Sequence, residues 1–477
     1  MQESIVGRKS ELKTLEKALL TSEAELIAVT GRRRIGKTFL ITEAYQNHIV
    51  FEMIGTQNGV LDTQLDNFAD QLSKFSEASY PIKPPTTWAE AFRLLRDYLQ
   101  NKASDSKKVV FFDELPWLAG QKSGFLDAFG YFWNSWASRQ NVIVAICGSA
   151  ASWMIQKVVN DTGGLHNRIT KHLHLSPFTL AETEEYLQSR GHYYDRYQIV
   201  QLYMAVGGVP HYLKEIDASK SVVQNIDTLC FAKNGLLNDE FNRLYTSLFP
   251  NSENHILVVR TLAQKRQGMT RNELIDISKL GNGGGFSTII NELMQSGFIS
   301  ETYPFGKTQK DKLYRLDDEY SLFYLQFIEK NRQQGRNLWQ HLSQTPAYKT
   351  WSGFAFEGVC LKHSDQIKQA LSIAGIFSTV SSFYQKGTSE AEGVQIDMVL
   401  DRNDHTINLF EIKFYNQPFT LTKDYADQLR QKMWRFQSGT KTKKHVYWVF
   451  ISAFGLVQNQ YSVGLITNSL TIDDLFL

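Results

Sequence analysis

The chain has 477 residues, 42% of them hydrophobic and 21% charged, which is enough for about three domains with cores of their own. Its formal net charge of only +2 excludes nucleic-acid binding through overall charge, so any such binding needs a local basic face. The three cysteines lie far apart and form neither a disulfide framework nor a zinc-binding spacing. No apolar run reaches the ~18 residues of a membrane span, and the first ten residues lack the layout of a signal peptide. We therefore expect a soluble, cytoplasmic protein with no membrane partner.

The pattern GRRRIGKT at residues 31–38 fits the phosphate-binding loop G-x-x-x-x-G-K-[ST]. Glycines allow such a loop to wrap its N–H groups around phosphate oxygens. An apolar run at 24–30 precedes it and a helical pattern at 39–45 follows it, which is the strand–loop–helix setting that the motif requires. Lys37 is expected to reach the β- and γ-phosphates of ATP, and the Thr38 hydroxyl to hold Mg²⁺. We assign to nucleotide binding Gly31, Arg32, Arg33, Arg34, Ile35, Gly36, Lys37, Thr38 and Phe39.

A second motif, KVVFFDELPW, occupies residues 108–117. Its four consecutive apolar residues suit a parallel strand that is covered on both faces. Asp113 at the end of this strand is expected to complete the Mg²⁺ shell, and Glu114 to orient the attacking water. Capping of the next helix is the structural alternative for this pair of acids. A further apolar run at 141–147 leads to Ser149, which is a candidate sensor of the γ-phosphate.

Four segments together resemble the prokaryotic archaeal-type ATPase family of the STAND/AAA+ group. They are GRRRIGKT, FFDELPW, PFTLAE at 177–182 and GGVPHYL at 207–213, and the resemblance spans at least residues 4–215. It implies ATP hydrolysis with ATP and Mg²⁺ as cofactors, and a helical lid that starts at Pro177-Phe178. It also implies particular roles for residues outside the P-loop: Val6, Gly7 and Arg8 over the adenine, Arg168 as an arginine finger or sensor, and Pro210 near the nucleotide base.

Residues 251–318 have the pattern of a winged helix. A helical run at 255–265 is followed by the capping box Thr270 to Glu273, and glycines at 283–285 precede a third helix. Two short strands, 298–303 and 312–316, then enclose a lysine-bearing loop. Such a domain grips DNA through its third helix, with phosphates neutralised by Arg271, Lys307, Lys310, Lys312 and Arg315. The third helix is not strongly basic, however, and in STAND-type proteins the same fold often acts as an intramolecular hinge, so both roles remain open.

The C-terminal region, 345–477, contains two alternating runs around a polar turn at 402–405, which predicts a β-hairpin. Folding the hairpin about this turn places Asp397 opposite Phe410 or Glu411. Because strand side chains repeat every two residues, Glu411 and Lys413 share a face. Two carboxylates and a lysine are therefore expected to converge.

This grouping resembles the PD-(D/E)XK nuclease superfamily, with Asp397 as the first acid and Glu411-Ile412-Lys413 as the E-x-K element. The resemblance implies that Asp397 and Glu411 hold Mg²⁺ or Mn²⁺, that Lys413 positions or activates the water, and that Glu357 is the assisting acid of the first helix. The segment 424–436 departs from the pattern of one exonuclease branch, because it lacks the Q-x-x-x-Y spacing. A structural ion pair between Glu411 and Lys413 is the alternative interpretation.

The expected fold is α/β: a P-loop ATPase core at 1–178, a helical lid at 179–250, a winged helix at 251–318, a helical linker at 319–344 and a restriction-endonuclease-like domain at 345–477. We expect an ATP-driven switch coupled to a nuclease-like domain that acts on DNA, with copies of the chain forming a nucleotide-dependent homo-oligomer. The alternative is a signalling ATPase whose C-terminal domain binds a partner or nucleic acid without cutting. A helicase fits less well, because no helicase motif series follows the ATPase core.

Overall fold

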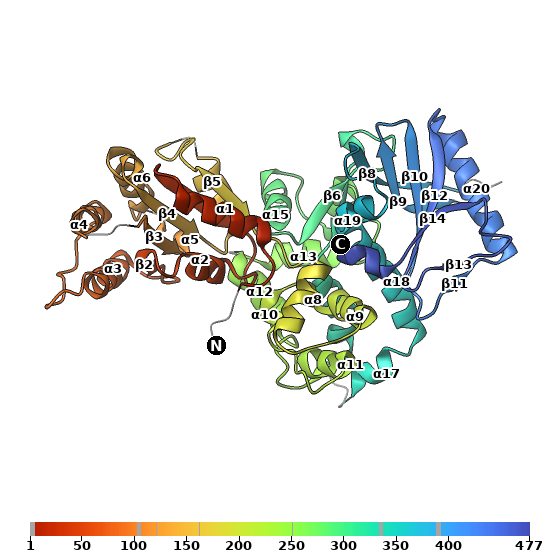
Figure 1. The fold of residues 1–477 in the computed structure, drawn as a ribbon, viewed down its shortest axis with the longest axis horizontal. Coiled ribbons are helices and arrows are strands. Elements are labelled where there is room, and N and C mark those ends of the chain that lie inside the picture. Colours follow the sequence, from red (N-terminus) through yellow and green to blue (C-terminus); the bar gives the residue numbers. More distant parts are fainter. Residues whose placement is uncertain are drawn as a thin grey trace. The chain divides into compact units, whose positions relative to one another are not determined.

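The computed structural model describes residues 5–102, 106–120, 122–161, 163–249, 251–332, 337–387 and 393–477 (Figure 1). Pro250, the last residue of the expected lid, lies outside these ranges. The chain divides into two compact units. The first comprises residues 1–177, 248–250 and 291–297, and the second comprises 178–247, 251–290 and 298–477.

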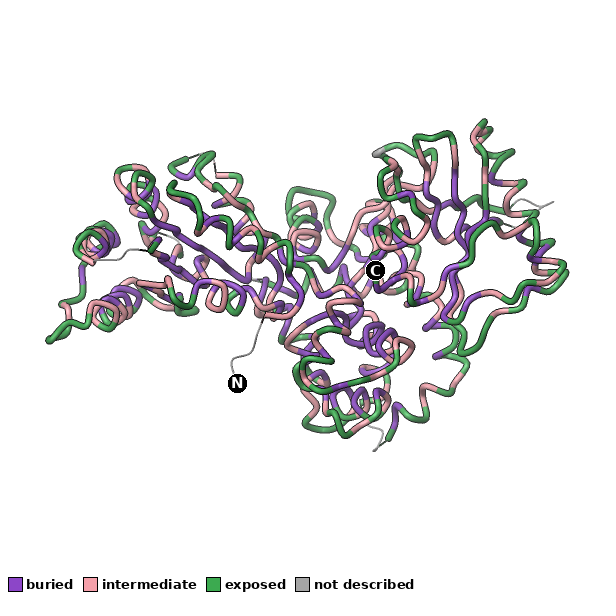
Figure 2. Tube along the Cα trace, viewed as in Figure 1, coloured by how far each residue is buried: buried purple, intermediate pink, exposed green. Residues whose placement is uncertain are grey.

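The first unit is built on a five-stranded parallel sheet with the order β2-β3-β4-β1-β5. Its strands are β1 (Glu25–Thr30), β2 (Ile49–Ile54), β3 (Lys108–Asp113), β4 (Val142–Cys147) and β5 (Lys171–His174). Successive residues of β1 enter different clusters, with Leu26 and Ala28 on one face and Ile27 and Val29 on the other. The apolar runs in the sequence are therefore strands buried on both faces, as Figure 2 shows.

Helices cover both faces of this sheet. Helices α1 (Lys9–Leu20) and α2 (Lys37–Tyr45) contribute to one cluster, and α3 (Leu61–Phe75), α4 (Trp88–Asn101) and α6 (Phe125–Ser135) to the other. In α4 the apolar face formed by Trp88, Ala91, Phe92, Leu95 and Leu99 is buried. The Thr87 side chain accepts a hydrogen bond from the Glu90 N–H at the start of the helix. The shorter elements are α5 (Leu115–Leu118), η1 (Ala137–Arg139), α7 (Ala151–Met154) and η2 (Ile155–Val159).

The second unit begins with the helical lid. Its elements are α8 (Leu180–Ser189), α9 (Arg196–Val206), α10 (Pro210–Leu213), α11 (Val222–Ile226), η3 (Asp227–Phe231) and α12 (Glu240–Leu248). The two lid motifs meet, because the Phe178 N–H donates to the Gly208 carbonyl over 2.6 Å. A Cβ atom at Gly208 would lie 2.0 Å from the Phe178 carbonyl oxygen, so this close approach requires glycine.

Three helices and a hairpin follow: α13 (Glu253–Leu262), α14 (Arg271–Ser278), α15 (Gly284–Gln295), β6 (Ile299–Thr302) and β7 (Leu313–Leu316), with η4 (Gln309–Asp311) in the loop. The predicted capping box at Thr270 and Glu273 is present at the start of α14. Short helices then lead onward: α16 (Glu319–Phe323), η5 (Tyr324–Ile328), η6 (Glu329–Asn331) and α17 (Leu338–Leu342).

The C-terminal part is a mixed sheet with the order β14-β12-β10-β9-β8 (Figure 1). The strands are β8 (Ser378–Gln385), β9 (Val394–Arg402), β10 (Thr406–Lys413), β12 (His445–Ser452) and β14 (Ile466–Leu470). Strands β8, β9 and β10 pair antiparallel, whereas β10, β12 and β14 pair parallel. Around them lie α18 (Pro346–Lys362), α19 (Ser364–Ala370), α20 (Lys423–Thr440), the small pair β11 (Phe419–Thr420) and β13 (Leu456–Val457), and η7 (Ile472–Phe476).

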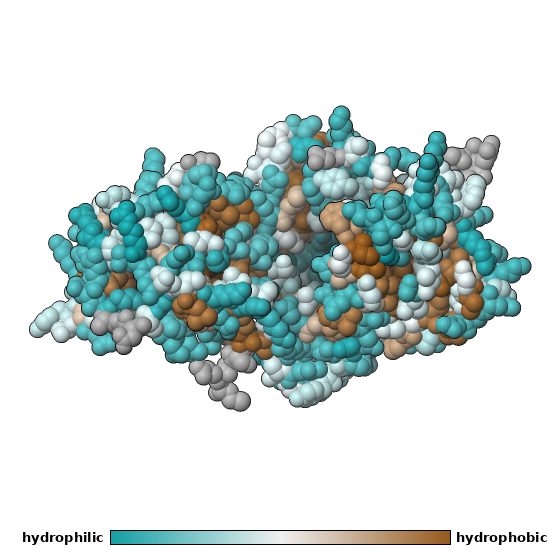
Figure 3. Space-filling model, turned by 45° about the horizontal axis from the view of Figure 1, so that its top comes forward, coloured by the Kyte–Doolittle hydropathy of each residue, from teal (hydrophilic) through white to brown (hydrophobic). Residues whose placement is uncertain are grey.

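Among the described residues, none of the helices combines the length and apolar character needed to cross a membrane. On the face drawn in Figure 3, hydrophilic side chains surround scattered apolar patches.

Candidate nucleotide site and carboxylate cluster

The loop between β1 and α2 has the backbone that phosphate binding requires. Gly31 has φ +132° and Gly36 has φ +87°, a left-handed value that favours glycine. A Cβ atom at Gly31 would lie 2.4 Å from the Leu175 carbonyl oxygen, so no side chain fits there. The loop leads directly into α2, whose positive N-terminal end favours an anion.

Lys37 and Thr38 occupy the predicted positions in the loop. The Lys37 ammonium is buried and donates to the carbonyls of Gly31 and Arg32 over 3.0 and 2.9 Å. Burial lowers the pKa of Lys37, although the nearby thiol and carboxylates oppose that effect. The Thr38 hydroxyl donates to Asp113 over 2.6 Å, so the two expected Mg²⁺-shell residues are side by side. An alcohol and a carboxylate at this distance fit a hard cation, and the loop above them fits the phosphates of ATP.

Glu114 directly follows β3 in the chain and lies at the carboxyl edge of the sheet. Its φ of 48° is left-handed, a conformation that is uncommon for a non-glycine residue and that clusters at functional sites. Its carboxylate accepts from the Ser149 N–H over 2.9 Å and from the Ser149 hydroxyl over 2.8 Å. Because β4 lies between β1 and β3, the structure brings Ser149 between the P-loop strand and the acidic strand. Glu114 is therefore held in place by hydrogen bonds and does not serve only as a helix cap.

Sequence reasoning missed one neighbour of this site. The Cys147 thiol donates to Asp113 over 2.6 Å, and burial together with the Asp113 charge raises its pKa well above the usual value. Cys147 is thus a neutral donor that orients the carboxylate. Its position at the end of β4, two residues before the expected sensor Ser149, could have indicated this role in the sequence.

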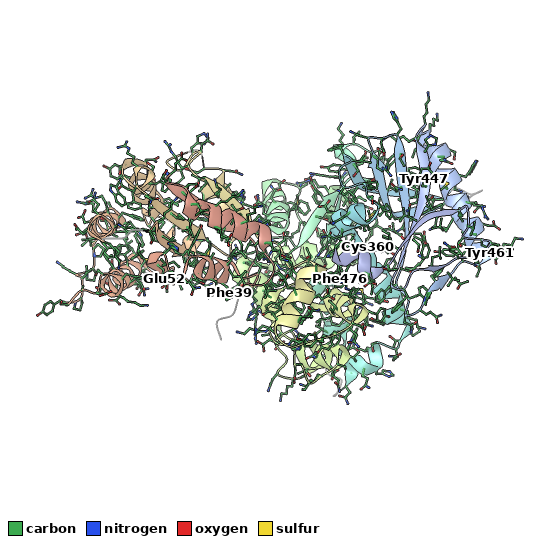
Figure 4. The ribbon with its side chains drawn as sticks, viewed as in Figure 1. Phe39, Glu52, Cys360, Tyr447, Tyr461 and Phe476 are labelled. Carbon is green, nitrogen blue, oxygen red and sulfur yellow. The ribbon has the colours of Figure 1, made fainter. Side chains whose placement is uncertain are left out.

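The remaining predicted nucleotide residues are spread more widely. The Arg8 guanidinium donates to the carbonyls of Ser176 and Ile35 over 2.6 and 3.4 Å, which ties the chain start to the P-loop. Phe39 projects from α2 with 37% of its surface exposed (Figure 4). Pro210 begins α10 in the second unit.

Arg168 is exposed in the turn that precedes β5. Strand β5 runs parallel to β1, so Arg168 lies at the amino edge of the sheet and the P-loop at the carboxyl edge, four paired residues or roughly 13 Å of strand further on. The structure does not bring Arg168 to the P-loop of its own chain.

The predicted carboxylate grouping forms at the β9–β10 hairpin. The last paired residues of the two strands are Phe410 and Met398, so the next position sets Glu411 opposite Asp397, within the predicted register. The Asp397 carboxylate accepts from the Ile412 N–H over 3.4 Å. Glu357 reaches the same cluster from α18, where its charge interacts with Asp397, Glu411 and Lys413.

Glu411 is the buried centre of this cluster, with 1% of its surface exposed. Its carboxylate forms an ion pair with Lys413 over 2.8 Å and a second one with Lys432 over 2.8 Å, and it accepts from the Tyr425 hydroxyl. Sequence reasoning missed Lys432 and the role of Tyr425. Tyr425 and Lys432 are seven residues apart, which places them two turns apart on one face of α20. This spacing in the sequence could have indicated that both face the cluster.

Desolvation and the charges of neighbouring groups determine the charge state of the cluster. Burial, and then the Asp397 charge, raises the pKa of Glu357 to about 8. Burial and the Glu411 charge raise the pKa of Asp397 to about 6. For Glu411, burial acts in the same direction, but the two lysines outweigh it and leave the pKa below the usual value.

One buried acid, Glu411, and two partly buried acids, Glu357 and Asp397, supply carboxylate oxygens, which are the ligands that hard cations prefer. Over the described ranges, no group of three or more His, Cys, Asp and Glu side chains is arranged closely enough to hold a metal ion. Mg²⁺, however, commonly uses only one or two protein carboxylates together with water and substrate phosphates. Asp397 and Glu411 offer oxygens of the kind that such an ion uses, while both oxygens of Glu411 are engaged here by Lys413, Lys432 and Tyr425.

The basic residues of the 251–318 segment are mostly engaged within the chain. Lys312 pairs with Glu301 over 2.9 Å, and Arg315 pairs with Asp317 over 2.8 Å. Arg271 donates to the Asn282 side chain. Lys307 and Lys310 in the hairpin loop are exposed.

Comparisons with known proteins bear on the segment that contains the P-loop. Residues 5–216 match the family described as "ATPase domain predominantly from Archaea". "Uncharacterized protein MJECL04" of Methanocaldococcus jannaschii is 23% identical over 447 residues, which are 90% of each chain. The solved Walker-type ATPase paby2304 of Pyrococcus abyssi has a TM-score of 0.50 and 17% identity, covering 68% of this chain and 97% of that chain. The Aeropyrum pernix ORC2 protein, solved in ADPNP–ADP complexes, has a TM-score of 0.42 and 13% identity, covering 70% and 96%.

A parallel sheet with a P-loop after β1 and an acid pair after β3 is the fold of Walker-type ATPases, and the likeness to the Pyrococcus abyssi protein agrees with this fold. Residues 5–216, somewhat less than half of the chain, are similar to an ATPase domain that occurs predominantly in Archaea. The predicted α/β class, P-loop sheet and helical lid are confirmed. The family match ends before the C-terminal mixed sheet begins.

Proposed function

We propose that this ATPase is a nucleotide-driven switch that controls a metal-dependent phosphodiesterase site in its C-terminal sheet, acting on nucleic acid and most simply on DNA. The observation that carries the proposal is the convergence of Asp397, Glu411 and Lys413 at one hairpin, with Glu357 beside them. A PD-(D/E)XK-like nuclease needs two acids for a cation and a lysine beside them. In this assignment Lys413 positions the water and Lys432 holds the Glu411 carboxylate in place.

Contacts between the lid and the carboxylate cluster support control by the nucleotide. Tyr197 of lid helix α9 stacks on Phe414 with ring centres 4.9 Å apart and an angle of 4° between the planes. Phe414 follows Lys413 directly and also packs against Phe356, with ring centres 5.1 Å apart. Phe356 precedes Glu357 on α18. A lid that changes position with bound nucleotide would therefore move two residues of the cluster through one ring.

A second contact joins the lid to the same helix. The Leu180 N–H at the start of α8 donates to Nε2 of His363 over 3.0 Å, and Nδ1 of His363 donates to the Val359 carbonyl over 2.8 Å. At the other end of the lid, Arg196 forms ion pairs with Glu184 and Asp473. The lid is thus attached to the C-terminal region at several points, through Phe414, His363 and Asp473.

Arg168 fits this proposal as a residue that acts between copies. It lies at the edge of the sheet away from its own P-loop, so an arginine-finger role requires the nucleotide of a neighbouring copy in a homo-oligomer.

A signalling ATPase that binds nucleic acid or a partner without cutting is the second candidate. The observation that favours it is the double ion pair of Glu411, because a carboxylate held by two lysines is also a stable structural unit. Metal-dependent cleavage separates the two candidates.

The test is cleavage of labelled single- and double-stranded DNA and RNA by the full chain, with Mg²⁺ or Mn²⁺ and with ADP or a non-hydrolysable ATP analogue. We expect cleavage that depends on the nucleotide and is lost in Asp397→Ala and in Lys413→Ala, while ATP binding is retained. Cleavage that survives Asp397→Ala would point to another site. Absence of both cleavage and metal binding under every condition would leave the signalling function.

A further inference from the structure

A cavity of about 570 Å³ opens onto the carboxylate cluster and lies wholly within the second unit. Glu357 and Asp397 both line it. One wall is formed by α18, β8 and β9, and the other by the 265–268 turn that precedes α14 and by the hairpin segment 302–317. The cavity therefore connects the 251–318 segment with the proposed reaction site.

The hairpin wall is held against the C-terminal sheet. The Phe305 N–H donates to the Ser382 carbonyl of β8 over 2.8 Å. The Phe305 ring packs against Phe436 of α20, with ring centres 5.0 Å apart. The wall covers the edge strand of the sheet and limits what can reach the acids from this side.

The size of the cavity selects the form of a nucleic-acid substrate. Its volume corresponds to a cube roughly 8 Å on a side, within the range of small-ligand pockets. The major groove of B-DNA alone is about 12 Å wide, so an intact duplex does not fit into the space in front of Glu357 and Asp397. A volume of this size is typical of pockets for small ligands, the class to which a single unpaired nucleotide belongs.

The chemistry of the lining also suits an unpaired nucleotide. The Arg266 guanidinium lies over the Phe354 ring, 5.2 Å from its centre, and both side chains line the cavity. Guanidinium planes and aromatic rings are the platforms on which proteins stack unpaired bases. Glu357 is the carboxylate whose charge acts on Arg266, so this platform lies beside the proposed reaction site.

The other cations of the lining divide into two groups. Three are paired with carboxylates: Lys265 with Glu273, Arg315 with Asp317, and Lys362 with Glu319. Lys307 and Lys386 are exposed at the cavity and carry the positive charge that a phosphate backbone needs.

We infer that the C-terminal site takes an unpaired nucleic-acid strand, one nucleotide at a time, and that Arg266 with Phe354 forms the platform that contacts it. This inference rests on the proposed phosphodiesterase for its ligand class. Arg266 is then a binding residue supplied to the carboxylate cluster by the 251–318 segment, and that segment serves the site through its turn and its hairpin.

The experiment measures strand binding separately from cleavage. Fluorescence anisotropy of the full chain is recorded with a labelled twelve-nucleotide single-stranded DNA, the same DNA as a duplex, and the same sequence as single-stranded RNA, with Ca²⁺ in place of Mg²⁺. We expect one or both single strands to bind at least tenfold more tightly than the duplex. The DNA and RNA arms identify which strand chemistry the site prefers.

The variants test the platform itself. Arg266→Ala and Phe354→Ala should each weaken single-strand binding by about 5- to 150-fold, the range that follows from a loss of about 1–3 kcal/mol per stacked base. Arg266→Lys keeps the charge but loses the plane and should also weaken binding. Lys349→Ala, an exposed cation on α18 outside the cavity, is the matched control and should bind as the wild type does.

The two proposals fail in different ways. Equal affinity for duplex and single strand, or unchanged binding by both Arg266→Ala and Arg266→Lys, would overturn the inference whether or not cleavage occurs. Selective single-strand binding that depends on Arg266, without cleavage in Mg²⁺ or Mn²⁺, would support the inference and reject the phosphodiesterase. Protection of the β9 and β10 amides from hydrogen exchange, equal to that of the wild type, verifies that the C-terminal sheet of each variant is folded.

Discussion

Removing the two lysines that hold Glu411 tests whether this buried carboxylate is a metal ligand or only part of an ion pair. Each lysine forms one charge-assisted contact of 2.8 Å with a side chain that is 1% exposed. Loss of one such bond costs about 1.5–3 kcal/mol. With both removed, as Lys413→Met/Lys432→Met, the carboxylate is left buried without a counter-charge, which costs about 3–5 kcal/mol.

Local hydrogen exchange of the β10 amides is the suitable assay, because a chain of several domains does not unfold in one step. We expect the double variant to lose about 3–5 kcal/mol of the local unfolding free energy of β10. Glu411→Gln added to the double variant should restore most of this loss, because it removes the buried charge. Mg²⁺ should restore stability as well, by about 2.7 kcal/mol at a concentration of one hundred times its Kd. The metal assignment is refuted if neither Mg²⁺ nor Mn²⁺ protects β10 in the double variant while Glu411→Gln does.

Three further outcomes follow from the contacts described above. Glu114→Gln should bind ATP but hydrolyse it at least a hundredfold more slowly, in contrast to Lys37→Ala, which should lose binding; equal turnover of wild type and Glu114→Gln would remove this residue from the mechanism. Burial lowers the pKa of His363 from 6.5 to about 4. Between pH 6.5 and pH 4 the imidazole binds a proton only when the region around it is unfolded. The free energy of unfolding of this region therefore falls as the pH drops from 6.5 towards 4, and at pH 5 it is about 2 kcal/mol lower than at neutral pH. In His363→Gln, this fall in the free energy of unfolding between pH 6.5 and pH 4 should be absent. If the variant and the wild type show the same dependence of this free energy on pH, His363 is not its cause. Tyr197→Leu should abolish any difference in Mn²⁺ affinity between the ADP and ATP-analogue states in calorimetry, whereas Tyr197→Phe and the exposed control Tyr193→Leu should preserve it.

Much of the nucleotide site could be predicted from the sequence because its determinants are local. A strand, a glycine loop and a helix follow one another without interruption, so Lys37 and Thr38 are placed by neighbours in the chain. The hairpin of β9 and β10 is equally local, since a short polar turn determines its register and thus the pairing of Asp397 with Glu411. The family match supports an ATPase domain over residues 5–216, whereas the roles of the individual residues at both sites remain predictions.

The missed residues reach their sites from distant parts of the chain. Lys432 contacts Glu411 from α20, and Arg266 approaches Glu357 from the turn after α13; neither contact is encoded in a short motif. The order of the parallel strands could not be predicted from the sequence pattern either, because each strand is an apolar run of similar length. Placing Ser149 against Glu114 depends on β4 lying beside β3, which only the assembled sheet reveals.

The same contacts bear on the two roles left open for the 251–318 segment. A hairpin that grips duplex DNA must itself be exposed, whereas here Phe305 contacts β8 and α20. Of the hairpin cations, Lys312 and Arg315 pair with carboxylates, and Lys307 and Lys310 are exposed in the loop. These contacts favour an internal role over insertion into a groove. They do not remove nucleic acid from the proposal, because the segment also presents Arg266 to the cavity. In this proposal the nucleic acid binds in the cavity between this segment and the sheet, where an unpaired strand would contact the platform of Arg266 and Phe354 and the carboxylates at the same time.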